Sequence, residues 1–180
     1  MKFNNKRLTA LLIALSFSAS LWALPEDKTQ PIKLEADQAK MNNKTGVSEY
    51  TGNVIIIQGT AELRADKVFL YSENNEVTRM EAFGSPAKYQ QILNPGEEPT
   101  HIEGNKLDLK VKENNAIVTG NGKVFRGEDV LESNKITYSL DTGELKASAS
   151  DPKTNPGDSR VKFIINPQIK DKSSDSEPQK

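Results

Sequence analysis

Cysteine is absent from the 180 residues of this chain. Disulfide bonds, a thiol nucleophile and thiolate metal ligands are therefore excluded. Histidine occurs once, as His101, and no serine stands at the spacing of a nucleophile elbow. A Ser-His-Asp system is formally available, but a position in a surface loop is the simpler interpretation of this histidine. The sequence favours a protein without enzymatic activity and without a bound cofactor.

The chain has no excess of positive charge either. It contains 24 basic and 25 acidic residues, and three of the basic ones (Lys2, Lys6 and Arg7) stand within the first 23 residues. Without that segment, 21 basic residues face 25 acidic residues, which gives a net charge of −4. Neutralising the phosphates of a nucleic acid requires a concentrated basic face. We therefore do not expect nucleic acid as a partner.

Residues 1–23 have the pattern of a secretory signal peptide. The three basic residues precede an apolar core at 8–15, and small residues then lead to a predicted cleavage after Ala23. Serines at 16, 18 and 20 interrupt the apolar run, which is too short to span about 30 Å of hydrocarbon. We expect a mature domain over 24–166 and a disordered polar tail over 167–180.

Amphipathic helical periodicity is missing from the mature chain, and an internal repeat takes its place. Residues 34–41, 63–70, 102–109 and 131–138 align without gaps as aliphatic, charged, small, Asp or Asn, Lys or Gln, apolar. The Asp or Asn positions (37, 66, 105 and 134) are spaced by 29, 39 and 29 residues. The chain is therefore a duplicated pair of units, with about ten residues added after the second unit.

The pattern that follows each Asp or Asn has period two, which is typical of a β-strand. The aliphatic residue three places earlier has the opposite parity, so a β-bulge at the small residue would let both face inward. Turn signals follow at 42–44, 73–75, 113–115 and 141–143. The side chains predicted on the apolar face include Ala39 and Met41, Val68 and Leu70, Leu107, Leu109 and Val111, and Ile136 and Tyr138.

These features predict an all-β fold of a dozen or more short antiparallel strands. One hairpin cannot bury its apolar face alone, so the hairpins must stack into a rolled sheet with a continuous interior. The segment 86–93, with the loop at 94–96, is expected to add one strand and a turn.

The recurring Asp37, Asp66, Asn105 and Asn134 could suggest calcium ligands. They alternate with Lys or Gln and share a place beside the predicted bulge. Capping of local backbone donors is the simpler interpretation, and no metal site is expected. The pairs Glu97–Glu98 and Glu128–Asp129 stand at turn signals, where solvated carboxylates are expected rather than the convergent pair of a glycosidase.

Several short motifs together resemble the OstA-like family of the lipopolysaccharide transport pathway. They stand at 30–32, 36–38, 50–54, 58–60, 65–68, 84–87, 118–121 and 134–138. The resemblance covers about residues 28–166. It implies an open β-jellyroll with a hydrophobic groove for the acyl chains of lipopolysaccharide (its lipid A part), a periplasmic location and head-to-tail self-association into a homo-oligomer. The implied partners are an LptC-like inner-membrane protein and an LptD-like outer-membrane protein.

The resemblance also implies roles for individual residues. The acyl-chain groove is expected at Ile32, Ile56, Leu70, Tyr89, Leu107, Leu109, Val111, Phe125 and Tyr138. The self-associating edges are expected at Ile32, Leu34, Val161, Phe163 and Ile165. Without the resemblance, an ordinary filled core would be the simpler interpretation of the first set. A structural β-repeat protein that binds partners only through its ends thus remains the alternative, and a polysaccharide-active enzyme is a third.

Overall fold

The computed structural model describes residues 27–149 and 160–166. The signal peptide expected at 1–23 and the tail expected at 167–180 lie outside the described residues. The described chain forms ten strands and two short 3₁₀ helices: η1 (Asp27–Thr29), β1 (Lys33–Glu35), β2 (Gln38–Asn42), β3 (Val47–Gln58), β4 (Ala61–Glu73), β5 (Glu76–Gln91), β6 (Thr100–Lys110), η2 (Val111–Glu113), β7 (Asn115–Arg126), β8 (Asp129–Ser139), β9 (Leu145–Ser148) and β10 (Lys162–Ile164).

All ten strands belong to one antiparallel sheet, which confirms the predicted all-β class. The order along the sheet is β1-β3-β4-β5-β6-β7-β8-β10, with β2 also paired to β3 and β9 also paired to β8. The expectation of a dozen or more short strands is wrong, because six of the strands are 11 to 16 residues long. The segment 86–93 was expected as a separate strand, but its residues up to Gln91 continue β5 through a bend.

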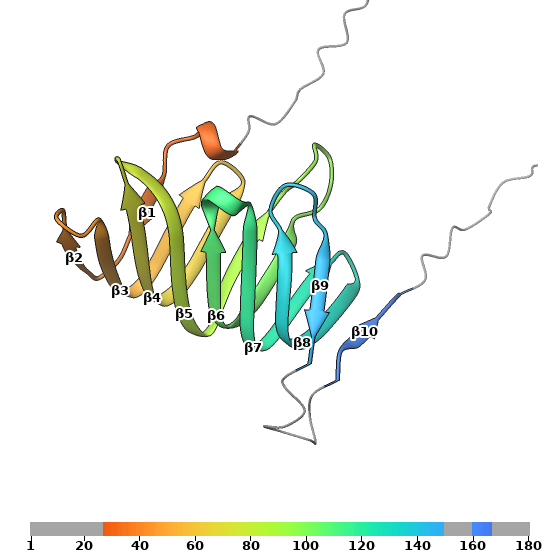
Figure 1. The fold of residues 1–180 in the computed structure, drawn as a ribbon. Helices are drawn as coiled ribbons and strands as arrows, with labels where there is room; N and C mark the ends of the chain where they lie inside the picture. Colours follow the sequence, from red (N-terminus) through yellow and green to blue (C-terminus); the bar gives the residue numbers. More distant parts are fainter. Residues whose placement is uncertain (1–26, 150–159, 167–180) are drawn as a thin grey trace, which may run out of the picture.

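The bends lie at the level that the repeat predicts. Between β3 and β4 the register breaks after Thr51, so that three steps of β3 oppose two of β4. The register breaks at the same level between each following pair, from β4–β5 to β7–β8. An extra residue bends a strand and increases its twist. Figure 1 shows the long strands curving at the lower side of the view, with hairpin turns above.

The bends divide the sheet into two halves, which we call the first and second half-sheet. The first contains β1, β10 and the strand segments 54–58, 61–65, 87–91, 100–104, 122–126 and 129–133. The second contains β2, β9 and the segments 47–51, 67–73, 76–83, 106–110, 115–119 and 135–139. The inner faces of both halves form one core, which includes Val54, Leu63, Val68, Ile102, Leu107, Val118, Val124 and Ile136.

The two-residue period correctly predicts most of this core but fails in β2. Ala39 and Met41 were expected on the apolar face, yet every residue of β2 is exposed and Met41 keeps 69% of its accessible surface. The reason is the position of β2 in the sheet. Among the described strands, β2 pairs only with β3 at the end of the sheet, so its inner face lacks the neighbours that bury Val68 or Leu107.

At the first bend, the repeated Asp37 meets the glycine of the neighbouring strand. Its carboxylate Oδ2 accepts a hydrogen bond of 3.0 Å from the Asn53 side chain, and its backbone N–H donates to the Gly52 carbonyl at 2.9 Å. The sequence predicted that this carboxylate would accept a hydrogen bond from a backbone N–H. In the structure it accepts one from the Asn53 side chain instead. Gly52 has a φ of +80°, which an L side chain adopts only with strain.

Gly52→Ala is expected to lower stability more than Gly96→Ala. Both glycines have positive φ, +80° and +83°, so each alanine brings strain of about 1 kcal/mol. A Cβ at position 52 would also lie 2.2 Å from Asp37 Oδ2, whereas nothing lies within 4 Å of a Cβ at position 96. We expect losses of about 2 and about 1 kcal/mol in unfolding free energy, measured by denaturant titration. Equal losses would contradict a tight contact at the bend.

Candidate functional site

A partly open apolar hollow lies between the two half-sheets, on the side of the hairpin turns. Ile56 and Leu63 contribute from the first half-sheet, and Met80 and Leu109 from the second. Each wall exists because strand alternation sends these side chains to the inner face while the chain bends below them. The arrangement can hold the apolar part of a ligand and offers no catalytic constellation.

Five of the nine residues predicted for a groove line this hollow: Ile32, Ile56, Tyr89, Leu109 and Val111. Val111 does so from η2 rather than from a strand, because β6 ends at Lys110. Leu70, Leu107 and Tyr138 are buried residues of the interior that do not line the hollow.

The inward placement of Phe125 is wrong. In β7 the buried side chain is Val124, and strand alternation turns Phe125 to the outer face. There it lies opposite His101 of β6 and lines a shallow outer depression with Arg64 and Lys88. His101 itself is exposed within β6 rather than in the loop that the sequence suggested.

Polar groups gather at one margin of the hollow, where residues 27–32 lie against the β3–β4 turn. We call this segment the strap. The Asp27 carboxylate accepts hydrogen bonds of 2.7 Å from both the backbone N–H and the hydroxyl of Thr60, and one of 3.3 Å from the Gln91 amide. The Gln58 amide donates to the carbonyls of Lys28 and Gln30, at 3.3 and 3.0 Å. This network was not predicted from the sequence, because its partners are 28 to 64 residues apart and share no motif.

Tyr89 joins the apolar wall to this polar margin. Its hydroxyl donates to Gln91 Oε1 at 3.0 Å. Burial raises the pKa of Tyr89 well above its ordinary value, and the nearby charge of Asp27 adds to the effect. Tyr89 therefore stays neutral in the wall of the hollow at any physiological pH.

Two buried polar atoms in the described residues have no hydrogen-bond partner. They are Oδ1 of Asn114 and the hydroxyl of Tyr138. Asn114 lines the hollow, whereas Tyr138 lies deeper. A buried acceptor without a partner is costly, and such a group in a hollow can be satisfied by a ligand that brings a donor.

The outer face of the second half-sheet carries a charged and aromatic cluster. Arg79 forms a bidentate pair with Asp108, at 2.6 and 2.8 Å, and also contacts Glu81 at 2.9 Å. Glu81 accepts further hydrogen bonds of 2.6 Å from Tyr71 and Lys106. The hydrogen bond to Glu81 raises the pKa of Tyr71. This cluster ties β4, β5 and β6 together on the face opposite the hollow.

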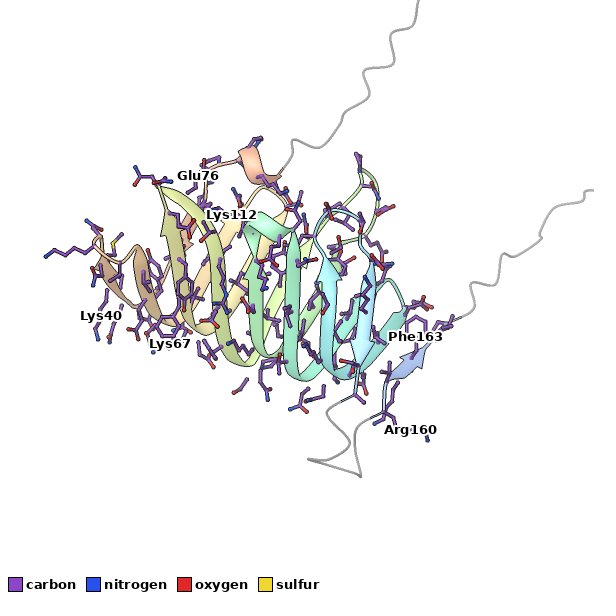
Figure 2. The ribbon with its side chains drawn as sticks, in the orientation of Figure 1. Lys40, Lys67, Glu76, Lys112, Arg160 and Phe163 are labelled. Carbon is purple, nitrogen blue, oxygen red and sulfur yellow. The ribbon has the colours of Figure 1, made fainter. Side chains whose placement is uncertain are left out.

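The two ends of the sheet differ. At one end, β1 and β2 pair only with β3 among the described strands, and at the other β10 and β9 pair only with β8. Ile32 is exposed and Leu34 half-buried beside the first end, while Val161, Phe163 and Ile165 are all exposed at the second. Figure 2 shows Lys40 and Phe163 at these opposite ends. Phe163 keeps 56% of its accessible surface.

Neither a metal-binding cluster nor a membrane-spanning helix is found in the described part of the chain. No group of three or more His, Cys, Asp or Glu side chains there is arranged to hold a metal ion. Across 27–149 and 160–166, no helix has the length and apolar character needed to cross a bilayer.

Known proteins resemble this chain along most of its length. The lipopolysaccharide export system protein LptH of Pseudomonas aeruginosa is 30% identical over 162 residues, which cover 89% of this chain and 92% of LptH. The export protein LptA of Escherichia coli K12 is 28% identical over 181 residues, covering 97% of this chain and 94% of LptA.

A solved structure has the same fold. The crystal structure of LptH, described as the LptA-homologous periplasmic component of the lipopolysaccharide transport device of Pseudomonas aeruginosa, superposes with a TM-score of 0.73 at 29% identity. The match covers 79% of this chain and all of LptH. The open β-jellyroll implied by the resemblance is thereby confirmed. Residues 33–144, from β1 to the turn before β9, match the family described as LptA/(LptD N-terminal domain) LPS transport protein, and this chain belongs to that family.

Proposed function

We propose that the protein is a periplasmic lipopolysaccharide-binding bridge that carries lipopolysaccharide from the inner to the outer membrane. The apolar hollow between the half-sheets is the observation that carries the proposal. It shelters acyl chains, and the protein performs no chemistry on them. The relatives named for lipopolysaccharide export support this role, and a cleaved signal peptide at 1–23 would deliver the chain to the periplasm.

Acyl-chain binding needs few specific contacts. Each CH₂ group transferred from water to an apolar surface contributes about 0.8 kcal/mol. About ten methylenes, spread over the acyl chains and packed against side chains such as Ile56, Met80 and Leu109, would contribute about 8 kcal/mol, which is comparable with the roughly 4–15 kcal/mol lost on association. The open side allows the polar head of the lipid to stay in water while its chains lie between the half-sheets.

The two ends of the sheet would join copies into a longer groove. An exposed strand edge recruits another strand, and β1 and β10 offer different edges. The contact is therefore heterologous and does not close on itself, which produces open head-to-tail filaments. The same edges would accept an LptC-like protein at the inner membrane and an LptD-like protein at the outer membrane.

Photo-crosslinking tests the lipid-binding groove directly. A photoreactive residue at Leu109, inside the hollow, should capture lipopolysaccharide in cells, whereas the same residue at Phe125, on the outer face, should not. Both positions replace an apolar side chain in a long strand, so Phe125 is a matched control. Crosslinked products are detected by immunoblotting for lipopolysaccharide.

The alternative is a structural β-repeat protein that binds partners only through its ends. In that case neither position would capture lipid, and gently purified protein would carry no lipopolysaccharide in its mass spectrum. Equal capture at Leu109 and Phe125 would also contradict the groove, because lipid would then lie on both faces of the sheet.

A further inference from the structure

The hollow carries charge at one place only, the strap. Of the residues that line it, Asp27 and Lys28 alone are ionisable near neutral pH, and both belong to η1. The rest of the lining is apolar or uncharged. The contacts of these two side chains therefore decide what kind of polar head the hollow can accept.

The Asp27 carboxylate is already engaged within the protein. Its two oxygens accept hydrogen bonds from the Thr60 N–H, the Thr60 hydroxyl and the Gln91 amide. A Cβ on the neighbouring Gly59 would lie 2.2 Å from Oδ1 of Asp27, so the turn approaches this carboxylate as closely as a glycine permits. Asp27 therefore fixes the strap to the β3–β4 turn and does not face a ligand as a free charge.

The Lys28 side chain is in the opposite situation. Its backbone carbonyl is held by Gln58, at 3.3 Å, but its ammonium has no ion pair with any residue that the structure describes. The pKa of Asp141 is lowered, chiefly by the hydrogen bond from Ser139 and to a smaller extent by Lys28. The backbone is thus fixed while three N–H donors stay available.

A second polar atom in the same hollow lacks a partner. Oδ1 of Asn114, on the second half-sheet side, is buried without a hydrogen bond to any described residue, while Nδ2 faces Asp141 at 3.5 Å. An amide Oδ1 can only accept hydrogen bonds, so a ligand N–H or O–H group would satisfy it. The hollow thus offers apolar walls, one acceptor and one cation.

We propose that Lys28 forms an anion subsite for a phosphate group of the bound lipid, with Asn114 accepting a hydrogen bond from an amide or hydroxyl next to the acyl chains. The subsite rests on the proposed function, since it assigns the polar head of the lipid whose chains occupy the hollow. Asp27 and Gln58 are positioning residues that hold the strap. The phosphate gains a charge-assisted hydrogen bond from the Lys28 ammonium.

The carboxylates near the mouth limit where a phosphate can bind. Asp27 lies on the strap itself, and Asp141 belongs to the turn between β8 and β9 on the facing side. Asp27 is engaged by hydrogen bonds, whereas Asp141 repels an anion that approaches from its side, so a phosphate is favoured at the ammonium of Lys28. The contribution of the subsite should therefore fall as salt is added.

The test compares two lipids on two variants of the full chain. Binding is measured for lipid A with two phosphates and for the same lipid after enzymatic removal of both, at low and at high salt. Lys28→Gln should weaken binding of the phosphorylated lipid about fivefold at low salt and leave the dephosphorylated lipid unaffected. Lys44→Gln, in the turn before β3, removes an exposed lysine outside the hollow and should match the unaltered protein for both lipids.

The outcomes separate the subsite from the function on which it rests. If Lys28→Gln weakens both lipids equally, or changes neither, the phosphate subsite is wrong while the groove stands. If the unaltered chain binds neither lipid, the proposed function and the subsite fall together. A thermal unfolding midpoint equal to that of the unaltered protein verifies that the variant is folded.

Discussion

A chain that ends at Asp158 is expected to stay monomeric at concentrations where the full chain assembles. The truncation removes β10, whose free edge and exposed Phe163 and Ile164 form one end of the sheet. Pairing of its three residues with β1 of a neighbour would form about three backbone hydrogen bonds, each contributing about 1 kcal/mol. Their loss should weaken assembly by about 100-fold, measured as concentration-dependent mass by light scattering.

A second truncation supplies the control for this experiment. A chain that ends at Asn166 keeps β10 together with the contacts that hold its end, from the Asn166 N–H to Asp129 and from the Asn166 amide to the Glu128 carbonyl. It should assemble like the full chain. If the chain that ends at Asp158 assembles equally well, then β10 is not the adhesive edge and the head-to-tail bridge loses its physical basis.

Leu107→Asp is expected to lower the stability of the fold by about 4 kcal/mol. Leu107 is fully buried at the centre of the second half-sheet, between Ala82 of β5 and Val118 of β7. A carboxylate there would have no cation and would lose its hydration, at a cost of about 4 kcal/mol. Domains of this size have a total stability of about 5–15 kcal/mol. Circular dichroism and denaturant titration should show a largely unfolded or severely weakened protein.

Thr119→Asp is the matched control for the buried charge. Thr119 is exposed on the outer face of β7 and pairs with Lys106 on one side and Lys135 on the other. A carboxylate between two lysines should change the unfolding free energy by less than about 0.5 kcal/mol. A similar loss from both substitutions would mean that the inner and outer faces are not distinguished by burial.

The repeat predicts the architecture well because two of its features are local physical requirements of a bent strand: a small residue at the bend and a change of apolar parity across it. Small residues such as Ala65 and Gly104 stand where a strand must bend inward, and the apolar residues on both sides of them reverse parity at that point. Both features are local in sequence. The bends, the turns and the inner faces of β4, β6 and β8 could therefore be predicted without knowing the neighbours of each strand.

The errors concern residues whose environment is set by distant parts of the chain. Met41 is apolar and has the right parity, but no described strand lies beyond β2 to cover it. Phe125 was assigned to the groove through the family resemblance, although the parity of β7 buries Val124 instead. The hydrogen bonds from Thr60 and Gln91 to Asp27 of the strap join three positions that no local sequence pattern connects.

The direction of the strands has a mechanical consequence for a cargo in the groove. The groove proposed above would follow the order of the sheet from β1 to β10, so the strands would cross it rather than run along it. A lipid moving lengthwise would pass one strand about every 4.8 Å and exchange one aliphatic contact for a similar one at each step. The free energy of the lipid along such a groove would have many shallow minima and no deep one. Travel along it would break no backbone hydrogen bond, so the sheet can stay intact while the cargo slides.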